Sequence, residues 1–209
     1  MAIPPDLVRA VSVATGLPLA TVTDLDRRLA IAGLRSKGGR GPNAAKVTPL
    51  DAARLLTAIV ASPQSNTAAE AVLRYSDTRP DKARSSSGLF ESLGLDDLSG
   101  LSAKHSFVEG LASVINSAAS GFLGKLASGS QDLHVEVFAF TQATRGRIRL
   151  SGVPNGLTAS VEYVPAEQTP SRKGKAAKTR KSSLGAIGDL EQSRRITERS
   201  IFAVARLFA

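Results

Sequence analysis

The sequence contains no cysteine and no tryptophan, and aromatic residues make up only 4% of its 209 residues. Without cysteine, disulfide bonds, thiol catalysis and thiolate zinc sites are excluded. Apolar residues nevertheless reach 42%, so we expect a core built mainly from Ala, Leu, Val and Ile. Small cores of this kind often depend on a partner chain, and we therefore expect self-association.

Long apolar runs are also missing. No segment approaches the roughly 18–20 apolar residues that a membrane-spanning helix needs. The first residues lack the basic and apolar regions of a signal peptide. These absences predict a cytoplasmic protein that does not bind membranes.

Motifs that carry catalysis are lacking too. The chain has no Gly-x-Ser-x-Gly, Walker or dinucleotide-binding motif. Its only histidines, His105 and His134, are better explained as lone surface or helix-capping side chains than as metal ligands. The adjacent carboxylates Asp96 and Asp97 fall in a predicted loop, where solvation explains them better than acid–base catalysis. We therefore predict no enzymatic activity, no cofactor and no metal site.

Positive charge, in contrast, is abundant. The chain has 27 Lys and Arg against 18 Asp and Glu, which gives a formal net charge of +9. The excess lies at the two ends, because residues 1–65 hold eight basic and four acidic residues and residues 167–209 hold ten and four. This balance suits a polyanionic partner, either nucleic acid or an anionic membrane, and we favour nucleic acid.

The N-terminal segment predicts three helices, at about residues 5–14, 18–32 and 49–61, with a basic, glycine-rich hairpin at residues 35–42. The third helix has a clear start, because Thr48 suits the N-cap and the following proline suits the first helical position.

The first two helices have the spacing of a helix-turn-helix motif. Gly16 allows the chain to reverse, Ser12 is the small residue four positions before it, and Val22 and Leu25 are the aliphatic residues that pack the second helix on the first. The segment around Gly16 resembles the corresponding segment of many bacterial repressors. The order of reader helix, Gly-Leu, basic loop and capped helix over residues 5–61 further resembles the winged helix of the MerR and excisionase family.

The resemblance implies that the second helix lies in the DNA major groove while the basic loop acts as a wing on the adjacent backbone. It implies DNA contacts from the exposed side of the second helix and from the wing, namely Thr21, Thr23, Asp24, Arg27, Arg28, Arg35, Lys37, Arg40 and Lys46. Asp24 departs from the pattern, since such repressors often carry a positive donor there. A carboxylate accepts from cytosine N4 but repels phosphate.

A second basic segment lies in the Pro-, Ser-, Lys- and Ala-rich stretch at residues 167–185, which we predict to be a disordered linker. Its cations are Arg172, Lys173, Lys175, Lys178, Arg180 and Lys181. Two interpretations remain open, a solvated linker or a tail that lies along DNA phosphates. Six phosphate contacts predict a log–log salt slope of roughly −5.

The centre of the chain predicts helices followed by a small sheet. Capping boxes open helices at residues 67 and 106, and residues 77–103 are typical of a loop. Alternating apolar residues then predict three strands, at residues 133–140, 146–150 and 159–163.

Arg145, Arg147 and Arg149 alternate along the second predicted strand and therefore share one face of the sheet. Glu136 and Glu162 on the neighbouring strands are expected to pair with them, which we favour over a nucleic-acid-binding stripe.

The last segment, residues 186–209, predicts a helix with an apolar side and with Arg194, Arg195 and Arg199 near its start. It is expected either to pack on the core or to bind a partner or a second copy of the chain.

Together these features predict an α+β protein with an N-terminal winged helix-turn-helix, central helices, a small three-stranded antiparallel sheet and a C-terminal helix. The expected units are a DNA-binding domain at residues 1–65, an oligomerisation or effector region at 66–166, the linker at 167–185 and the helix at 186–209. We predict a homo-oligomeric, nucleoid-associated protein that binds double-stranded DNA as a transcriptional regulator or mobile-element accessory factor. Two alternatives are a DNA-packaging protein resembling phage small terminase subunits and a scaffold that binds a protein partner.

Overall fold

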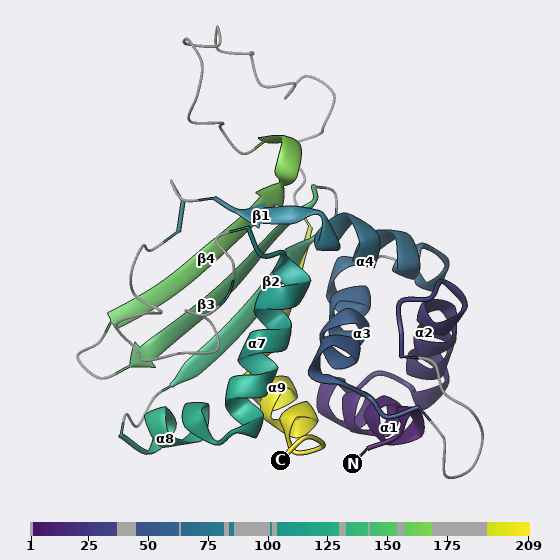
Figure 1. Ribbon diagram of the computed structural model, residues 1–209, viewed down its shortest axis with the longest axis horizontal. Helices are drawn as coiled ribbons and strands as arrows, with labels where there is room; N and C mark the ends of the chain where they lie inside the picture. The colour runs from purple at the N-terminus through teal and green to yellow at the C-terminus, as the bar shows by residue number, and fades with distance from the viewer. Residues whose placement is uncertain are drawn as a thin grey trace, which may run out of the picture.

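The computed structural model describes residues 2–36, 45–62, 64–81, 84–85, 101, 104–129, 133–141, 143–153, 157–168 and 192–209. A group of helices lies beside an antiparallel sheet, and a further helix covers one face of that sheet (Figure 1). The helices are α1 (Pro4–Thr15), α2 (Leu19–Ile31), α3 (Pro49–Ala61), α4 (Ala68–Ser76), α7 (Phe107–Ala119), α8 (Phe122–Gly129) and α9 (Glu198–Ala205). The strands are β1 (Thr78–Pro80), β2 (His134–Phe140), β3 (Arg145–Val153), β4 (Leu157–Pro165) and β5 (Ser193–Thr197). The fold is therefore α+β, as predicted.

The three N-terminal helices lie where the sequence predicts them. Gly16 ends α1 in the left-handed region, with φ of 73°, and its N–H donates to the Ser12 carbonyl at 2.9 Å. A residue without a side chain adopts this conformation at little cost, so the chain reverses into α2. At the start of α3, the Thr48 hydroxyl accepts from the Asp51 N–H at 3.2 Å and the Asp51 carboxylate accepts from the Thr48 N–H at 2.9 Å. A capping box thus begins this helix.

The sheet has five strands in the order β1-β4-β3-β2-β5, all antiparallel, so the prediction of three strands is wrong. The two additional strands are short and lie at the edges. β1 spans three residues of a segment predicted as loop, and β5 occupies part of the segment predicted as C-terminal helix, which shortens the helix there to α9. Edge strands of this length are held by backbone pairing and carry little apolar pattern in their sequence.

The core lies on both sides of α7, which covers the front of the sheet in Figure 1 and has α3 on its other side. Phe107, Leu111 and Ile115 of α7 are completely buried. Helix and sheet approach closely at Gly146, where a Cβ atom would lie only 2.5 Å from Cδ2 of Phe107. One hydrophobic cluster joins residues from Ala2 to Ala205, so the helices and the sheet share a core.

The predicted wing is shown only at its base. Among the described residues that flank it, 33–36 and 45–48, there is no strand. Its tip, with Lys37 and Arg40, lies outside the described residues, as does the basic segment that contains Arg172, Lys173, Lys175, Lys178, Arg180 and Lys181.

Candidate nucleic-acid interface

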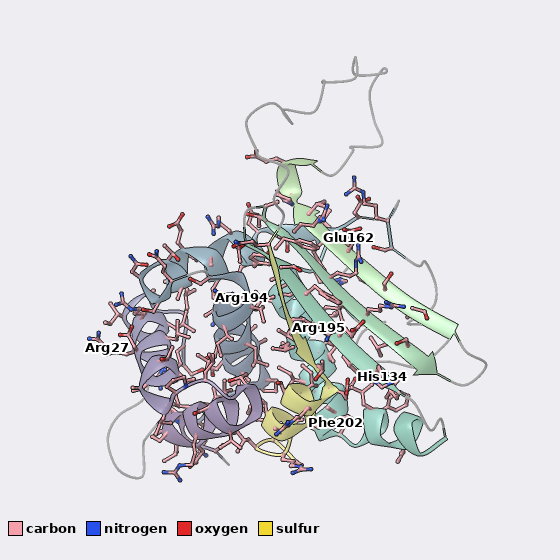
Figure 2. All side chains as sticks on the ribbon, turned by 180° about the vertical axis from the view of Figure 1, so that it is seen from behind. Arg27, His134, Glu162, Arg194, Arg195 and Phe202 are labelled. Carbon is pink, nitrogen blue, oxygen red and sulfur yellow. The ribbon has the colours of Figure 1, made fainter. Side chains whose placement is uncertain are left out.

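Helix α2 has one buried and one exposed side. Val22, Leu25 and Leu29 are buried toward α1, α3 and α4. The opposite side carries the five residues expected to contact DNA, Thr21, Thr23, Asp24, Arg27 and Arg28, of which the two threonines and Arg27 are exposed. Figure 2 shows Arg27 at the outer edge of the helical group, on the side away from the sheet. These three side chains are therefore accessible to solvent, whereas Asp24 and Arg28 are half-buried.

Asp24 is paired with both arginines of this side. Its carboxylate accepts from Arg27 Nη2 at 3.0 Å and from Arg28 Nε at 2.8 Å. Hydrogen bonds from Arg28 and Arg27 lower the pKa of Asp24 from its usual 3.8 to about 2. The carboxylate is thus ionised near neutral pH, and the exposed side of α2 has a smaller positive charge than its two arginines alone would give.

Arg35, at the base of the predicted wing, forms an ion pair within the protein. Its Nε lies 3.4 Å from Oδ1 of Asp26, and both side chains are largely buried. Burial raises the pKa of Asp26, an effect that the Arg35 charge opposes. A paired and largely buried guanidinium is poorly placed to contact phosphate, so this pair anchors the segment after α2 to α2 itself.

Asp51 holds both ends of the segment that contains the predicted wing tip. Its two carboxylate oxygens accept from the N–H and hydroxyl of Ser36, each at 2.8 Å, and from the N–H and hydroxyl of Thr48. Burial works against the charged form, but the hydrogen bonds from Ser36 and Thr48 outweigh it, so the pKa of Asp51 is lowered. Residues 36 and 48 therefore meet at the start of α3. Lys46, two positions before Thr48, is exposed beside this junction.

The arginines of the sheet form the predicted cross-strand ion pairs. In the strand register Glu136 is opposite Arg149 and Glu162 is opposite Arg147. Nitrogen-to-oxygen distances are 3.7 Å for the first pair and 3.4 Å for the second. Arg145 adds a further contact to Glu162 at 3.4 Å. The pairs lie on the face of the sheet that α7 does not cover. Each carboxylate is shared by two arginines, because Glu136 also pairs with Arg195, so this face keeps an excess of positive charge.

Each of the two histidines lies near a polar side chain. His105 precedes α7 and its Nε2 lies 2.9 Å from the buried hydroxyl of Tyr163, while His134 lies 3.9 Å from a Glu198 oxygen. Among the residues that the structure describes, no group of three or more possible metal ligands occurs. Within the same residues, no helix is long and apolar enough to span a membrane.

The sequence did not predict the ion pair and hydrogen bonds that hold the segment after α2 against α2 and α3. Asp26 and Ser36 were not singled out, and Asp51 was expected only to interact with the dipole at the start of the third helix, although all three hold the base of the predicted wing. Their spacing in the chain contains no repeat that predicts the contact, because it forms only when α2 and α3 pack together. Comparison with protein-family models, curated proteins and solved structures finds no match to this chain.

Proposed function

We propose that the protein binds double-stranded DNA, with α2 in the major groove, as a regulator or accessory factor that acts as a homo-oligomer. The single observation that carries the proposal is the exposed side of α2. It follows the reversal at Gly16 and presents Thr21, Thr23 and Arg27 together, with the 3-10 turn at Ser65–Thr67 beside Asp24. Hydroxyl and guanidinium groups on a helix of this length suit base edges and phosphates.

The charges of this side favour phosphate contact over tight base recognition. Because Asp24 pairs with Arg27 and Arg28, it fixes the direction of both guanidinium groups but also repels phosphate. In our proposal the arginines bind phosphates of the DNA backbone and the threonines contact base edges. Lys37, Arg40, Lys46 and the basic segment at residues 172–181 add phosphate contacts, whereas Arg35 acts as a structural anchor.

A single small helix-turn-helix contacts few base pairs, so tight binding to DNA needs two or more copies of the protein. We expect a dimer whose footprint shows two half-sites about one helical turn apart. Multi-angle light scattering measures the number of copies. A ring of eight or more copies would favour a DNA-packaging role instead.

Selection of bound sequences from random duplexes tests the proposal. The double variant Arg27→Ala/Arg28→Ala is compared with Arg149→Ala, which removes an arginine from the sheet on the other side of the protein. We expect a selected motif that the double variant loses, a duplex affinity at least about tenfold lower, and a salt slope reduced by about 2. Arg149→Ala should retain the motif. Equal binding by all three proteins, or no mobility shift at low salt, would contradict the proposal and favour a protein-binding scaffold.

A further inference from the structure

A cleft of about 670 Å³ separates the helical group from the edge of the sheet. It lies between the C-terminal ends of α1 and α3 on one side and β5 with the start of α9 on the other. Its lining residues are Ala14, Thr15, Leu17, Ile59, Val60, Arg194, Arg195, Ile196, Thr197, Arg199 and Ser200. This volume is within the range of roughly 300–1,000 Å³ that is typical of small-molecule sites.

The described lining of the cleft includes three arginines and no acidic residue. Arg194 donates to the carbonyl oxygens of Ile59 at 3.2 Å and Ser62 at 2.7 Å at the end of α3, and within the described residues it pairs with no carboxylate. Arg195 shares Glu136 with an arginine of β3. Arg199 is exposed and has no ion-pair or hydrogen-bond partner among the described residues. The cleft therefore has an excess of positive charge.

The position of Arg199 is unfavourable for the helix to which it belongs. It lies in the first turn of α9, where the helix dipole is positive and favours acidic side chains. Glu198 in the same turn supplies the acidic side chain that this end favours, whereas the exposed Arg199 guanidinium does not stabilise α9. An anion in the cleft would interact favourably with both the guanidinium and the helix end.

Ser200 gives an independent indication of a ligand. Its side chain is in the same turn, lines the cleft and is only 5% exposed, yet within the described residues its hydroxyl has no hydrogen-bond partner. Thr197, the N-cap residue of α9, makes no side-chain capping bond either. The Ser200 hydroxyl opens onto the cleft, so this hydroxyl and the first N–H groups of α9 are accessible to a bound group.

The cleft continues past Arg199 into a smaller hollow of about 440 Å³, which Val13, Phe202 and Arg206 also line. Figure 2 shows Arg194 and Arg195 on β5, with Phe202 on α9 further along the same side of the protein. Cations and unpaired donors thus lie next to a partly buried aromatic ring. This order of groups suits a ligand with phosphates at one end and a flat ring at the other.

We propose that this cleft binds a nucleotide, with its phosphates on Arg194, Arg199 and the start of α9 and its base against Phe202. The lining also includes Thr15 and Leu17 from the turn that precedes α2. An occupied cleft is therefore expected to alter DNA affinity. This last consequence alone rests on the proposed function, whereas nucleotide binding does not.

Isothermal titration of the full chain with ATP and with pyrophosphate, in magnesium-free buffer at physiological salt, tests the site. We expect saturable binding of one ATP per chain and weaker binding of pyrophosphate. Arg199→Ala should weaken both at least about tenfold, and Ser200→Ala should weaken both about threefold. Phe202→Leu should weaken ATP but leave pyrophosphate unchanged, because only ATP has a base. Arg74→Ala, on α4 and outside the cleft, is the control and should bind as the native chain does.

Circular dichroism of each variant establishes that it is folded. No saturable binding at millimolar ATP, or equal weakening by Arg74→Ala, would overturn the proposal. So would loss of duplex DNA binding in Arg199→Ala together with unchanged ATP affinity, since the cleft would then serve backbone phosphates. The titrations contain no DNA, so their outcome is independent of the interface on α2.

Discussion

Replacement of Asp51 by asparagine tests whether this carboxylate holds the base of the predicted wing. Oδ1 accepts from the Ser36 N–H, whereas Oδ2 accepts from the Thr48 N–H and from the hydroxyls of both Ser36 and Thr48. In Asp51→Asn the amide oxygen replaces one carboxylate oxygen and an NH₂ group replaces the other. The amide oxygen is expected at the Oδ2 position, where three donors converge, so the NH₂ group faces the Ser36 N–H, which cannot donate to it.

The expected cost follows from these contacts. One half-buried backbone N–H loses its acceptor and the remaining bonds lose their charge, which together correspond to about 3 kcal/mol of the free energy of unfolding. With an m-value of about 2 kcal/mol/M in urea, the midpoint should fall by about 1.5 M. Urea unfolding followed by far-ultraviolet circular dichroism measures this shift. Asp24→Asn is the control, because Asp24 pairs with surface arginines and its loss should leave the midpoint nearly unchanged.

The pH dependence gives a second measurement. Because the pKa of Asp51 is lowered in the folded protein, its charge stabilises the fold above the usual carboxyl pKa, and this stabilisation is lost as pH falls through the folded pKa. The difference between the native chain and Asp51→Asn should therefore be full above about pH 5 and shrink below about pH 4. An unchanged urea midpoint at neutral pH, or a difference that stays constant down to pH 3, would refute the assigned role of Asp51.

Four further variants have expected outcomes. Tyr75→Phe removes a buried hydroxyl whose single O–H is shared between the carbonyls of Phe140 and Arg145 and whose oxygen accepts the Phe140 N–H at the end of the β2–β3 hairpin. It should cost about 2–3 kcal/mol in urea unfolding. Tyr163→Phe, whose hydroxyl contacts the His105 ring nitrogen, should cost about 1 kcal/mol. A larger loss in Tyr163→Phe than in Tyr75→Phe would contradict this account. Gly146→Ala forces a Cβ atom against the buried Phe107 ring and should cost about 1–3 kcal/mol; an unchanged thermal midpoint would show that the ring moves freely. Asp24→Asn removes the one carboxylate on the exposed side of α2 and should tighten duplex binding about fivefold at low salt, whereas weaker binding in fluorescence anisotropy would assign Asp24 to base recognition.

Helix boundaries could be predicted from the sequence because they depend on signals a few residues apart. Thr48 with Asp51, and Ser106 with Glu109, form the capping boxes that begin α3 and α7. The capping box predicted at Thr67 does not form, since Thr67 instead hydrogen-bonds to Gln64 in a short 3-10 turn before α4. A local signal thus predicts that a helix exists more securely than how it begins.

The central strands could be predicted for a similar reason. Alternation of apolar and polar residues along β2, β3 and β4 distinguishes the face covered by α7 from the exposed face. The same alternation placed Arg147 and Arg149 on one face and made the ion pairs with Glu162 and Glu136 predictable. β5 escaped prediction because Ile196 is its one buried residue, and its pairing with β2 joins segments about sixty residues apart.

The sequence by itself determined the elements whose causes are local: the reversal at Gly16, the capped helices and the alternating strands. Only the tertiary structure decided which charges are available. Arg35 is neutralised by Asp26, Arg27 and Arg28 share Asp24, and Arg194 spans from β5 to the end of α3, while Arg199 is left facing a cleft. Charge in a sequence is a count of residues, whereas its availability depends on distance and burial, and these exist only after the chain has packed.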